Sequence, residues 1–203
     1  MPEWFFRGGI AMWPLLVCSI AGVAIILERT WALQRRRIIS PTLAAAIEKQ
    51  PVTPEQTQKL QVLSESDPTV LGKLIQAVFM HASLPKTENV EAMQALARQI
   101  VGRMERGLTT LSLIAELGPL LGLLGTVIGM VQLFEDVAKK GLGDPAMISR
   151  GIYEALTATM TGLGIAIPAL IAYMYLRRRI EVLTLELERY TNELLTRLYR
   201  DAN

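Results

Sequence analysis

Three long runs of uncharged residues dominate the hydrophobic pattern of the chain. They cover residues 8–27, 117–134 and 155–176, which is 20, 18 and 22 residues without a charged side chain. An α-helix rises about 1.5 Å per residue, so each run has about the length that a hydrocarbon core of about 30 Å requires. Buried helices of soluble domains rarely contain apolar runs longer than about 14 residues. We therefore predict an all-α integral membrane protein with three transmembrane helices.

These runs divide the chain into seven predicted segments. They are a short external N-terminus (1–7), transmembrane helix 1 (8–27), a cytoplasmic helical region (28–107), transmembrane helix 2 (108–134), an external hairpin (135–154), transmembrane helix 3 (155–176) and a cytoplasmic amphipathic helix (177–203). The second span starts before its uncharged core because Glu116, near its beginning, is tolerated there.

Arginine residues beside the apolar runs predict the orientation. They follow the first span, precede the second and follow the third: Arg29, Arg35, Arg36, Arg37, Arg98, Arg103, Arg106, Arg177, Arg178 and Arg179. The hairpin holds few basic residues, and these are mixed with acids. Because cytoplasmic loops are enriched in Lys and Arg, we expect the N-terminus outside and the C-terminus inside. Arginines also stand where a signal peptide would have its cleavage site, which favours an uncleaved first span.

Helical periodicity continues outside the membrane segments. Prolines break residues 38–85 into short helices, and residues 66–81 are typical of a capped amphipathic helix. No proline interrupts residues 86–117, so we expect one long helix that begins near an N-cap at Thr87 and enters the second span. The third span should continue into the tail as an amphipathic helix. Its apolar stripe packs either within the chain, against the helix over 86–107, or against other copies; the pattern leaves both open.

The second span carries its glycines on one side. At about 100° per residue, their spacing of 4-3-4 places four of them on one narrow stripe: Gly118, Gly122, Gly125 and Gly129. Glycine gains nothing by facing lipid, whereas it lets another helix approach closely. We predict that these four residues pack against another helix. Thr126 lies on the border of the stripe, where its hydroxyl could simply bond back to a carbonyl of its own helix.

The third span has two small or polar faces on opposite sides. One holds Thr157, Thr161, Gly164 and Pro168, and the other holds Ala155, Thr159, Gly162 and Ala166. Such a helix is typical of a channel wall, with a neighbouring helix on one side and a lumen on the other. Geometry alone does not decide which of the two faces points to the lumen. We expect Gly162 and Pro168 to take part in helix packing.

No ionisable side chain lies inside any of the three spans, although such a residue usually marks an ion or proton path. Glu116 and Glu154 come nearest, each at the end of a span. If the chain moves protons, another polypeptide must therefore supply the titrating group.

Other kinds of site lack their residues. Single Cys and His residues exclude a disulfide or metal framework, and the spans contain no catalytic constellation, so we expect no enzymatic activity, metal or cofactor. A net charge of +2 is too small to indicate nucleic-acid binding.

Two motifs resemble a known family. The stretches GPLLGLLGTVIGM (118–130) and GIYEALTATMTGLGIAIPALIAYMYL (151–176) look like the second and third spans of the MotA/TolQ/ExbB proton channel family. Three spans with an external N-terminus match the ExbB and TolQ branch, whereas MotA-type subunits have four. Within that branch ExbB is the closer expectation, with a TolQ-like subunit or a purely structural membrane scaffold as alternatives.

The resemblance implies a function. Family members form homopentamers in the bacterial inner membrane, and their second and third spans surround a pore. Two copies of a single-span partner, ExbD or TolR, stand in it with an essential aspartate, and the proton-motive force drives work on TonB-like or TolA-like proteins. The family's pore-lining threonines match Thr126 and Thr159, and the glutamate of its GIxEAL motif matches Glu154, toward the external end. A hydroxyl can donate to a carboxylate and accept from its protonated form, which suits such a pore.

Overall fold

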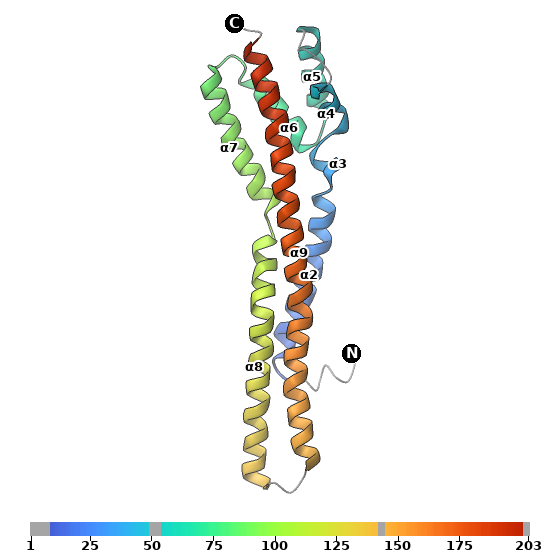
Figure 1. The fold of residues 1–203 in the computed structure, drawn as a ribbon, viewed down its shortest axis with the longest axis vertical. Helices are drawn as coiled ribbons and strands as arrows, with labels where there is room; N and C mark the ends of the chain where they lie inside the picture. The colour runs from blue at the N-terminus through green and yellow to red at the C-terminus, as the bar shows by residue number, and fades with distance from the viewer. Residues whose placement is uncertain (1–8, 49–53, 142–144, 201–203) are drawn as a thin grey trace. The chain divides into compact units, whose positions relative to one another are not determined.

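The structure, a computed structural model, describes residues 9–48, 54–141 and 145–200 (Figure 1). Its regular elements are α2 (Met12–Ala32), α3 (Arg35–Ile38), α4 (Pro41–Glu48), α5 (Pro54–Ser66), α6 (Val70–Met80), α7 (Lys86–Met104), α8 (Leu108–Lys140) and α9 (Pro145–Arg200). The prediction of an all-α chain is confirmed for these residues. The predicted N-terminal segment 1–7 lies outside the described residues, as do residues 142–144 of the predicted hairpin.

The chain forms two compact units. The first unit contains residues 1–28 and 107–175, and the second unit contains residues 29–106 and 176–203. Helix α9 is continuous over its 56 residues and contributes to both units. The prediction that the third span continues into the tail as one helix is thus confirmed.

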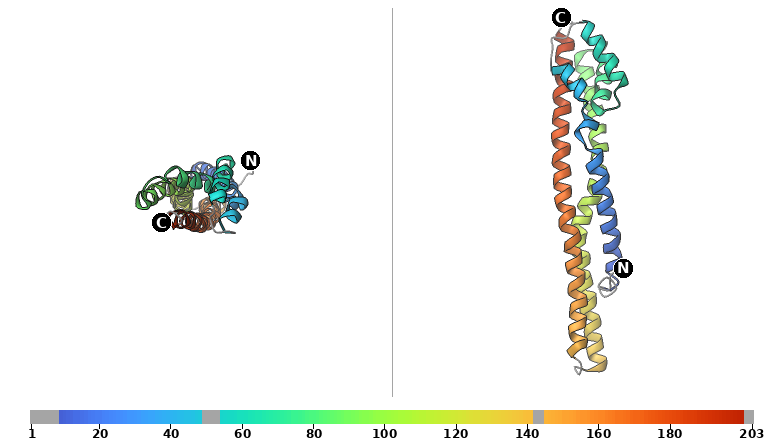
Figure 2. Two further views of the ribbon diagram at one scale, coloured as in Figure 1. Left: turned by 90° about the horizontal axis from the view of Figure 1, so that it is seen from above. Right: turned by 90° about the vertical axis from the view of Figure 1, so that its right-hand side faces the viewer.

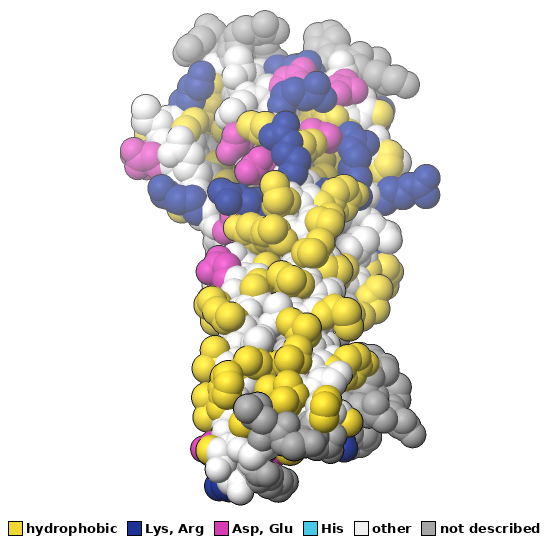
Figure 3. All heavy atoms as spheres, turned by 60° about the horizontal axis from the view of Figure 1, so that its bottom comes forward, with side chains coloured by type: hydrophobic (Ala, Val, Ile, Leu, Met, Phe, Trp, Pro, Cys, Tyr) yellow, Lys and Arg dark blue, Asp and Glu magenta, His cyan; other side chains and the backbone are white. Residues whose placement is uncertain are grey.

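Three of the described helices are long and apolar enough to cross a membrane. These are α2, α8 and α9, whose most apolar segments have mean hydropathies of 1.7, 1.9 and 1.7. Only 11% of that segment is buried in α2, and 33% in α8 and α9. Hydrophobic side chains are accordingly spread over the surface of this part of the chain (Figure 3). The three predicted membrane-length helices are present, and most of their apolar surface faces outward, as in a membrane protein.

In the first unit, α2 and the beginning of α9 lie beside α8, with α8 and α9 antiparallel (Figures 1 and 2). Met12 and Leu15 of α2 are 1% and 0% exposed and form a small core. Side chains from all three helices pack against this core: Leu16, Leu121 and Ile165. Helix α2 is therefore held at its N-terminal end by contacts to both other membrane-length helices.

The predicted continuous helix over residues 86–117 is wrong. Helix α7 ends at Met104 and α8 begins at Leu108, because Gly107 between them has φ +78°, in the left-handed region that interrupts a right-handed helix. The predicted N-cap is also displaced. The carbonyl of Pro85, not of Thr87, accepts the first helical hydrogen bond, from the Asn89 amide at 3.1 Å, so α7 begins at Lys86.

In the second unit, residues of α3, α4, α6 and α7 lie beside the C-terminal part of α9, and α5 packs against α6. The predicted capped helix over 66–81 is confirmed, since the Thr69 side chain accepts a hydrogen bond from the Gly72 amide at 3.2 Å at the start of α6. Of the two alternatives for the apolar stripe of the tail, packing within the chain is realised. Its buried members are Leu176, Ile180, Leu183, Leu187, Tyr190 and Leu194.

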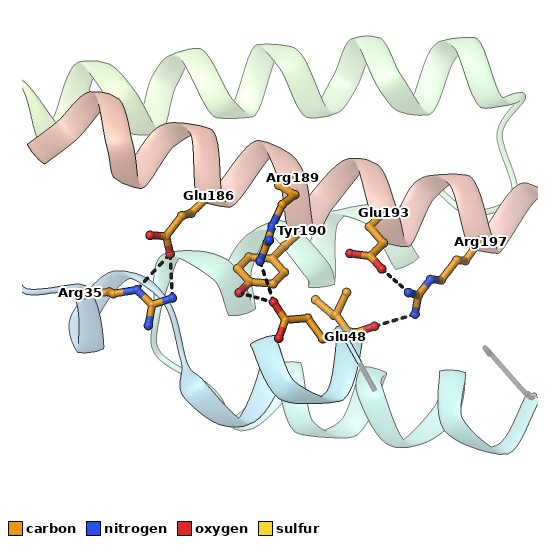
Figure 4. A network of polar contacts seen from close by, with 8 residues as sticks. Arg35, Glu48, Glu186, Arg189, Tyr190, Glu193 and Arg197 are labelled. Carbon is orange, nitrogen blue, oxygen red and sulfur yellow. Dashed lines mark hydrogen bonds and ion pairs between the residues drawn. The ribbon is translucent and has the colours of Figure 1, made fainter. Parts of the chain in front are cut away.

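Helix α4 also lies against this part of α9, a contact that was not predicted. The guanidinium of Arg197 donates to the Ile47 carbonyl at 2.6 Å, and the Tyr190 hydroxyl donates to the Glu48 carboxylate at 3.1 Å (Figure 4). Polar contacts therefore fix the end of α4 to α9 beside the buried apolar stripe.

Candidate functional site

Two threonine hydroxyls meet where α8 and α9 pack together. Thr126 of α8 and Thr159 of α9 hydrogen-bond to each other through their side chains. Both also reach one backbone oxygen: Oγ1 of Thr126 lies 3.1 Å and Oγ1 of Thr159 lies 3.0 Å from the carbonyl oxygen of Gly122. The predicted pore residues, which are 33 positions apart in sequence, thus form one polar cluster in a helix pair whose central segments carry no charge.

The chemistry of this cluster follows from its proton count. Two hydroxyls carry two protons, while each oxygen also keeps lone pairs that can accept. When one threonine donates to the other, the second can donate to the Gly122 carbonyl, and the two can exchange these roles by rotating about Cβ–Oγ1. Both side chains are only partly buried. The pair can therefore accept from, or donate to, a third group without ever holding a net charge.

Glycines of α8 bring the backbone of α9 to this cluster. A Cβ on Gly122 would lie 2.9 Å from Cα of Thr159 and 3.0 Å from the carbonyl oxygen of Ala158. Because those atoms belong to the backbone, they cannot yield without moving the helix. The missing side chain at Gly122 is what allows the Thr159 hydroxyl to reach the carbonyl of that same residue.

The same close approach extends along the whole glycine stripe. On Gly118, a Cβ would meet the Gly162 carbonyl at 3.0 Å; on Gly125, the Cβ of Ala158 at 2.6 Å; on Gly129, the Cβ of Ala155 at 3.1 Å. Gly162 is equally enclosed, with the Gly118 carbonyl at 2.5 Å from such an atom. We call these residues, with Gly122 and Ala158, the α8–α9 seam. It runs from one turn beyond the threonine pair to about two turns before it.

The opposite face of α9 meets α2. Thr157 is 4% exposed and donates to the Tyr153 carbonyl at 2.7 Å, and Thr161 donates to the Thr157 carbonyl at 2.8 Å. Both line a groove of about 570 Å³ with Met12, Leu16 and Ser19 of α2. Each of the two small faces thus has a helix of the same chain beside it. Thr157 and Thr161 satisfy their hydroxyls within α9, whereas Thr126 and Thr159 satisfy theirs across two helices.

The remaining predicted residues do not contact the threonine pair. The carboxylate of Glu154 pairs with Arg150 of the same helix at 3.1 Å. Glu116, at the other end of the seam, accepts from the Ser112 hydroxyl at 3.1 Å. Pro168 lies within α9 and is exposed, so its predicted packing role would need a neighbour outside this chain. Within the described ranges, no three His, Cys, Asp or Glu side chains gather in a way that could hold a metal ion.

Sequence reasoning did not single out Asn89, which is completely buried. Its amide group donates to the Val78 carbonyl at 3.2 Å and to the Tyr199 hydroxyl at 3.0 Å. The Tyr199 hydroxyl in turn donates to the Leu84 carbonyl at 2.8 Å. This polar cluster joins α6, α7 and the last turn of α9, and its only signal in the sequence is a polar residue on the apolar side of α7.

Comparison with known proteins gives a consistent picture. Residues 63–189 match the MotA/TolQ/ExbB proton channel family, and this range includes Thr126, Thr159 and the seam. An ExbB-like biopolymer transport protein of Synechocystis is 33% identical over 182 residues, covering 85% of this chain and 68% of the relative. The biopolymer transport protein exbB1 of Vibrio cholerae is 30% identical over 168 residues, covering 79% and 72%. ExbB of Neisseria gonorrhoeae is 38% identical over 100 residues, covering 49% and 46%. The resemblance found in the sequence is thereby confirmed.

Proposed function

The chain belongs to the MotA/TolQ/ExbB proton channel family, and from this we propose that it is an ExbB-like subunit of a motor in the bacterial inner membrane. In this proposal the motor uses the proton-motive force to energise TonB-dependent transport across the outer membrane. The relatives' names support the ExbB branch, since they are called biopolymer transport proteins of the ExbB type. The alternatives are a TolQ-like subunit and a purely structural scaffold.

The proposed topology uses the positive-inside rule. The arginines that follow α2 and those within α9 after Leu176 favour an N-terminus outside, with residues 28–107 and 177–203 in the cytoplasm. Residues 8–27, 108–134 and 155–176 then span the bilayer, with an external hairpin at 135–154. The mean hydropathies of α2, α8 and α9 support the three spans of this assignment.

The threonine pair carries the mechanism. Thr126 and Thr159 hydrogen-bond to each other across α8 and α9, and no acid lies in the interior of either span. We assign the pair to the wall of a pore beside an aspartate that a single-span, ExbD-like partner supplies. A carboxylate there would receive a hydrogen bond from the pair, and a protonated acid would donate one to it, so both states are stabilised without a fixed charge in the wall.

Assembly follows from the exposed surface of the first unit. The outward side chains of α8 and α9 are largely apolar, among them Leu120, Leu124, Leu156 and Met160. We propose that part of this surface meets lipid and part meets further copies of the chain, in the homopentamer that the family implies. Pro168, exposed in one chain, would pack at such a contact. Glu154, paired with Arg150, would lie at the external mouth of the pore.

Isosteric replacement of the two hydroxyls tests the proposal. In cells that lack their own ExbB, the chain and its partner should support uptake of a TonB-dependent substrate, and an ionophore that collapses the proton gradient should abolish that uptake. We expect Thr126→Val and Thr159→Val each to lower uptake at least tenfold, because methyl groups cannot exchange hydrogen bonds with the partner's acid. Pull-down of the tagged partner should show unchanged assembly.

Thr161→Val is the matched control. Its hydroxyl bonds only within α9 and lies on the groove toward α2, so uptake should remain near the parent level. Full uptake by Thr126→Val and Thr159→Val with assembly intact would instead favour a structural scaffold. Rescue of a TolQ-deficient strain, with no rescue of an ExbB-deficient one, would favour the TolQ-like alternative.

A further inference from the structure

The arginines of the second unit fall into two groups. In the first group, carboxylates engage Arg35 at the start of α3 and two arginines on the C-terminal part of α9, Arg189 and Arg197 (Figure 4). Arg35 pairs with Glu186 at 2.8 Å, Arg189 pairs with Glu48 at 2.6 Å, and Arg197 pairs with Glu193. These guanidiniums hold the helices of the unit together and are not available to a ligand without breaking those contacts.

The arginines that follow α2 are arranged differently. Arg37 places its guanidinium 3.4 Å from the centroid of the Trp31 ring, and Trp31 is 58% exposed on the last turn of α2. Arg36 is exposed and has no hydrogen bond, ion pair or ring contact within the described part of the chain. Neither side chain is neutralised by a carboxylate, although Arg35 beside them is.

A second pair of arginines lies between the end of α7 and the start of α8. Arg103 and Arg106 are exposed at the end of α7 and in the turn before α8, and within the described ranges neither side chain has an acidic partner. The guanidinium of Arg29 donates to the Arg103 carbonyl at 3.4 Å, which brings the end of α7 beside the last turns of α2. Unneutralised positive charge therefore collects where α2 ends and where α8 is about to begin.

We propose that Trp31, Arg36, Arg37, Arg103 and Arg106 form a binding surface for the phosphate headgroups of anionic phospholipids in the cytoplasmic leaflet. This inference rests on the membrane insertion and orientation proposed above, but not on proton transport or on any partner. We call these five residues the arginine surface.

Three physical arguments favour a lipid phosphate. A guanidinium presents paired N–H donors whose geometry matches phosphate oxygens, and it is less strongly hydrated than an ammonium. A tryptophan at the end of a spanning helix lies at headgroup depth, with its ring toward the acyl chains. Clusters of basic residues directly cytoplasmic of a spanning helix are attracted to anionic lipid. Stacking on Trp31 covers one face of the Arg37 guanidinium and leaves N–H groups at its edge to bind phosphate.

Quenching of Trp31 by brominated lipids tests the proposal locally. The protein is purified, reduced to one tryptophan by Trp4→Phe and Trp13→Phe, and reconstituted in vesicles of phosphatidylglycerol and phosphatidylcholine at equal mole fractions. In one set the phosphatidylglycerol carries bromine on its acyl chains, and in the other the phosphatidylcholine does. We expect brominated phosphatidylglycerol to quench Trp31 more, corresponding to local enrichment on the order of fivefold, and added salt to reduce the difference.

Charge-matched variants separate this surface from the overall charge of the protein. Arg36→Gln with Arg37→Gln should make the two lipids quench equally. Lys73→Gln with Lys86→Gln removes the same charge from exposed positions elsewhere in the second unit and should leave the preference intact. Arg36→Lys with Arg37→Lys keeps the charge and should keep most of the preference, which would show that replacing these two side chains does not by itself abolish it.

Three results would overturn the proposal. The first is equal quenching by both brominated lipids in the parent protein. The second is an equal loss of preference in the two glutamine variants, which would mean that net charge alone attracts the lipid. The third is loss of the preference when millimolar inorganic phosphate is added at constant ionic strength, which would assign the surface to a soluble phosphate. Because no partner protein is present, none of these results depends on whether the chain conducts protons.

Discussion

Gly122 shows how closely a single residue can determine the site. Its missing side chain leaves room for the backbone of α9, and its carbonyl oxygen lies within hydrogen-bond distance of both threonine hydroxyls. Gly164, on the other side of α9, has no atom within 4 Å of the position that a Cβ would take. Both glycines lie inside apolar helices, but a side chain at Gly122 would collide with α9, whereas a side chain at Gly164 would meet no other atom.

We therefore predict that Gly122→Ala destabilises the protein and Gly164→Ala does not. The added methyl at residue 122 meets backbone atoms, and overpacking of this kind costs about 1–3 kcal/mol. At residue 164 the methyl meets open space, and alanine in a helix is as stable as glycine or more so. The measurement is the midpoint of thermal unfolding in detergent, and equal midpoints for both variants would show that α8 and α9 do not pack through Gly122.

At this scale the sequence predicted part of the site. The 4-3-4 spacing of the α8 glycines indicated which side of that helix packs closely, and the contacts of Gly118, Gly122, Gly125 and Gly129 lie on that side. It did not indicate that Ala158 would be enclosed, because alanine occurs on every face of an apolar helix. The meeting of the Thr126 and Thr159 hydroxyls depends on the relative shift of two helices, which periodicity within each helix does not specify.

At the scale of elements, Gly107 separates α7 from α8. Met104 and Leu108 keep helical spacing across residues 105–107. A single glycine in such a pattern is compatible with an uninterrupted helix. The left-handed φ of +78° at Gly107 is what ends the helix, and this conformation costs a residue with a side chain about 1–2 kcal/mol. This is why proline positions alone predicted one helix where there are two.

Replacement of Gly107 tests this break. We predict that Gly107→Ala destabilises the protein by about 1–2 kcal/mol and that Gly107→Asn costs less, since asparagine tolerates the left-handed region better. Gly102→Ala, five residues earlier in α7 and facing open space, should be neutral or slightly stabilising. Urea titration of the purified protein measures all three, and a stabilised Gly107→Ala variant would mean that α7 and α8 form one helix.

The start of α6 carries a pH-dependent contribution. Burial alone would raise the pKa of Asp67, but hydrogen bonds from Ser40 and from the side chain and backbone of Thr69 outweigh it, and the pKa lies below its usual 3.8. The Thr69 amide donates to the Asp67 carboxylate at 2.8 Å. A carboxylate with a lowered pKa stabilises the fold fully above its unfolded pKa, and this stabilisation is lost as the pH falls through the folded value.

We predict that Asp67→Asn lowers the unfolding temperature at pH 6–7, and that the difference from the parent shrinks below about pH 4. Asparagine keeps an oxygen for the Thr69 amide but removes the charge. Comparing the two proteins at each pH cancels the titration of all other groups. A difference that is constant from pH 3 to pH 7 would show that the charge of Asp67 does not contribute.

At the scale of the whole molecule, the chain carries more exposed apolar surface than one copy can bury. The uncharged runs predicted the three membrane-length helices, because the length and composition of a span are properties of contiguous sequence. They did not predict how much of α8 and α9 would stay exposed in a single chain. The apolar residues of α9 after Leu176 are buried within the chain, whereas many apolar residues of the membrane-length segments of α8 and α9 are exposed. The central claim, that a second protein completes the site at Thr126 and Thr159, concerns this exposed part.

Disulfide formation between this chain and its partner tests that claim most directly. In a background where Cys18 is replaced by alanine, Thr159→Cys is combined with a cysteine one turn from the aspartate of the single-span partner, and the complex is oxidised in the membrane. We predict a cross-linked species for Thr159→Cys and none for Thr161→Cys, whose side chain lies on the groove toward α2. Cross-linking at Thr161→Cys with none at Thr159→Cys would contradict the account, because it would place the pore on the opposite face of α9.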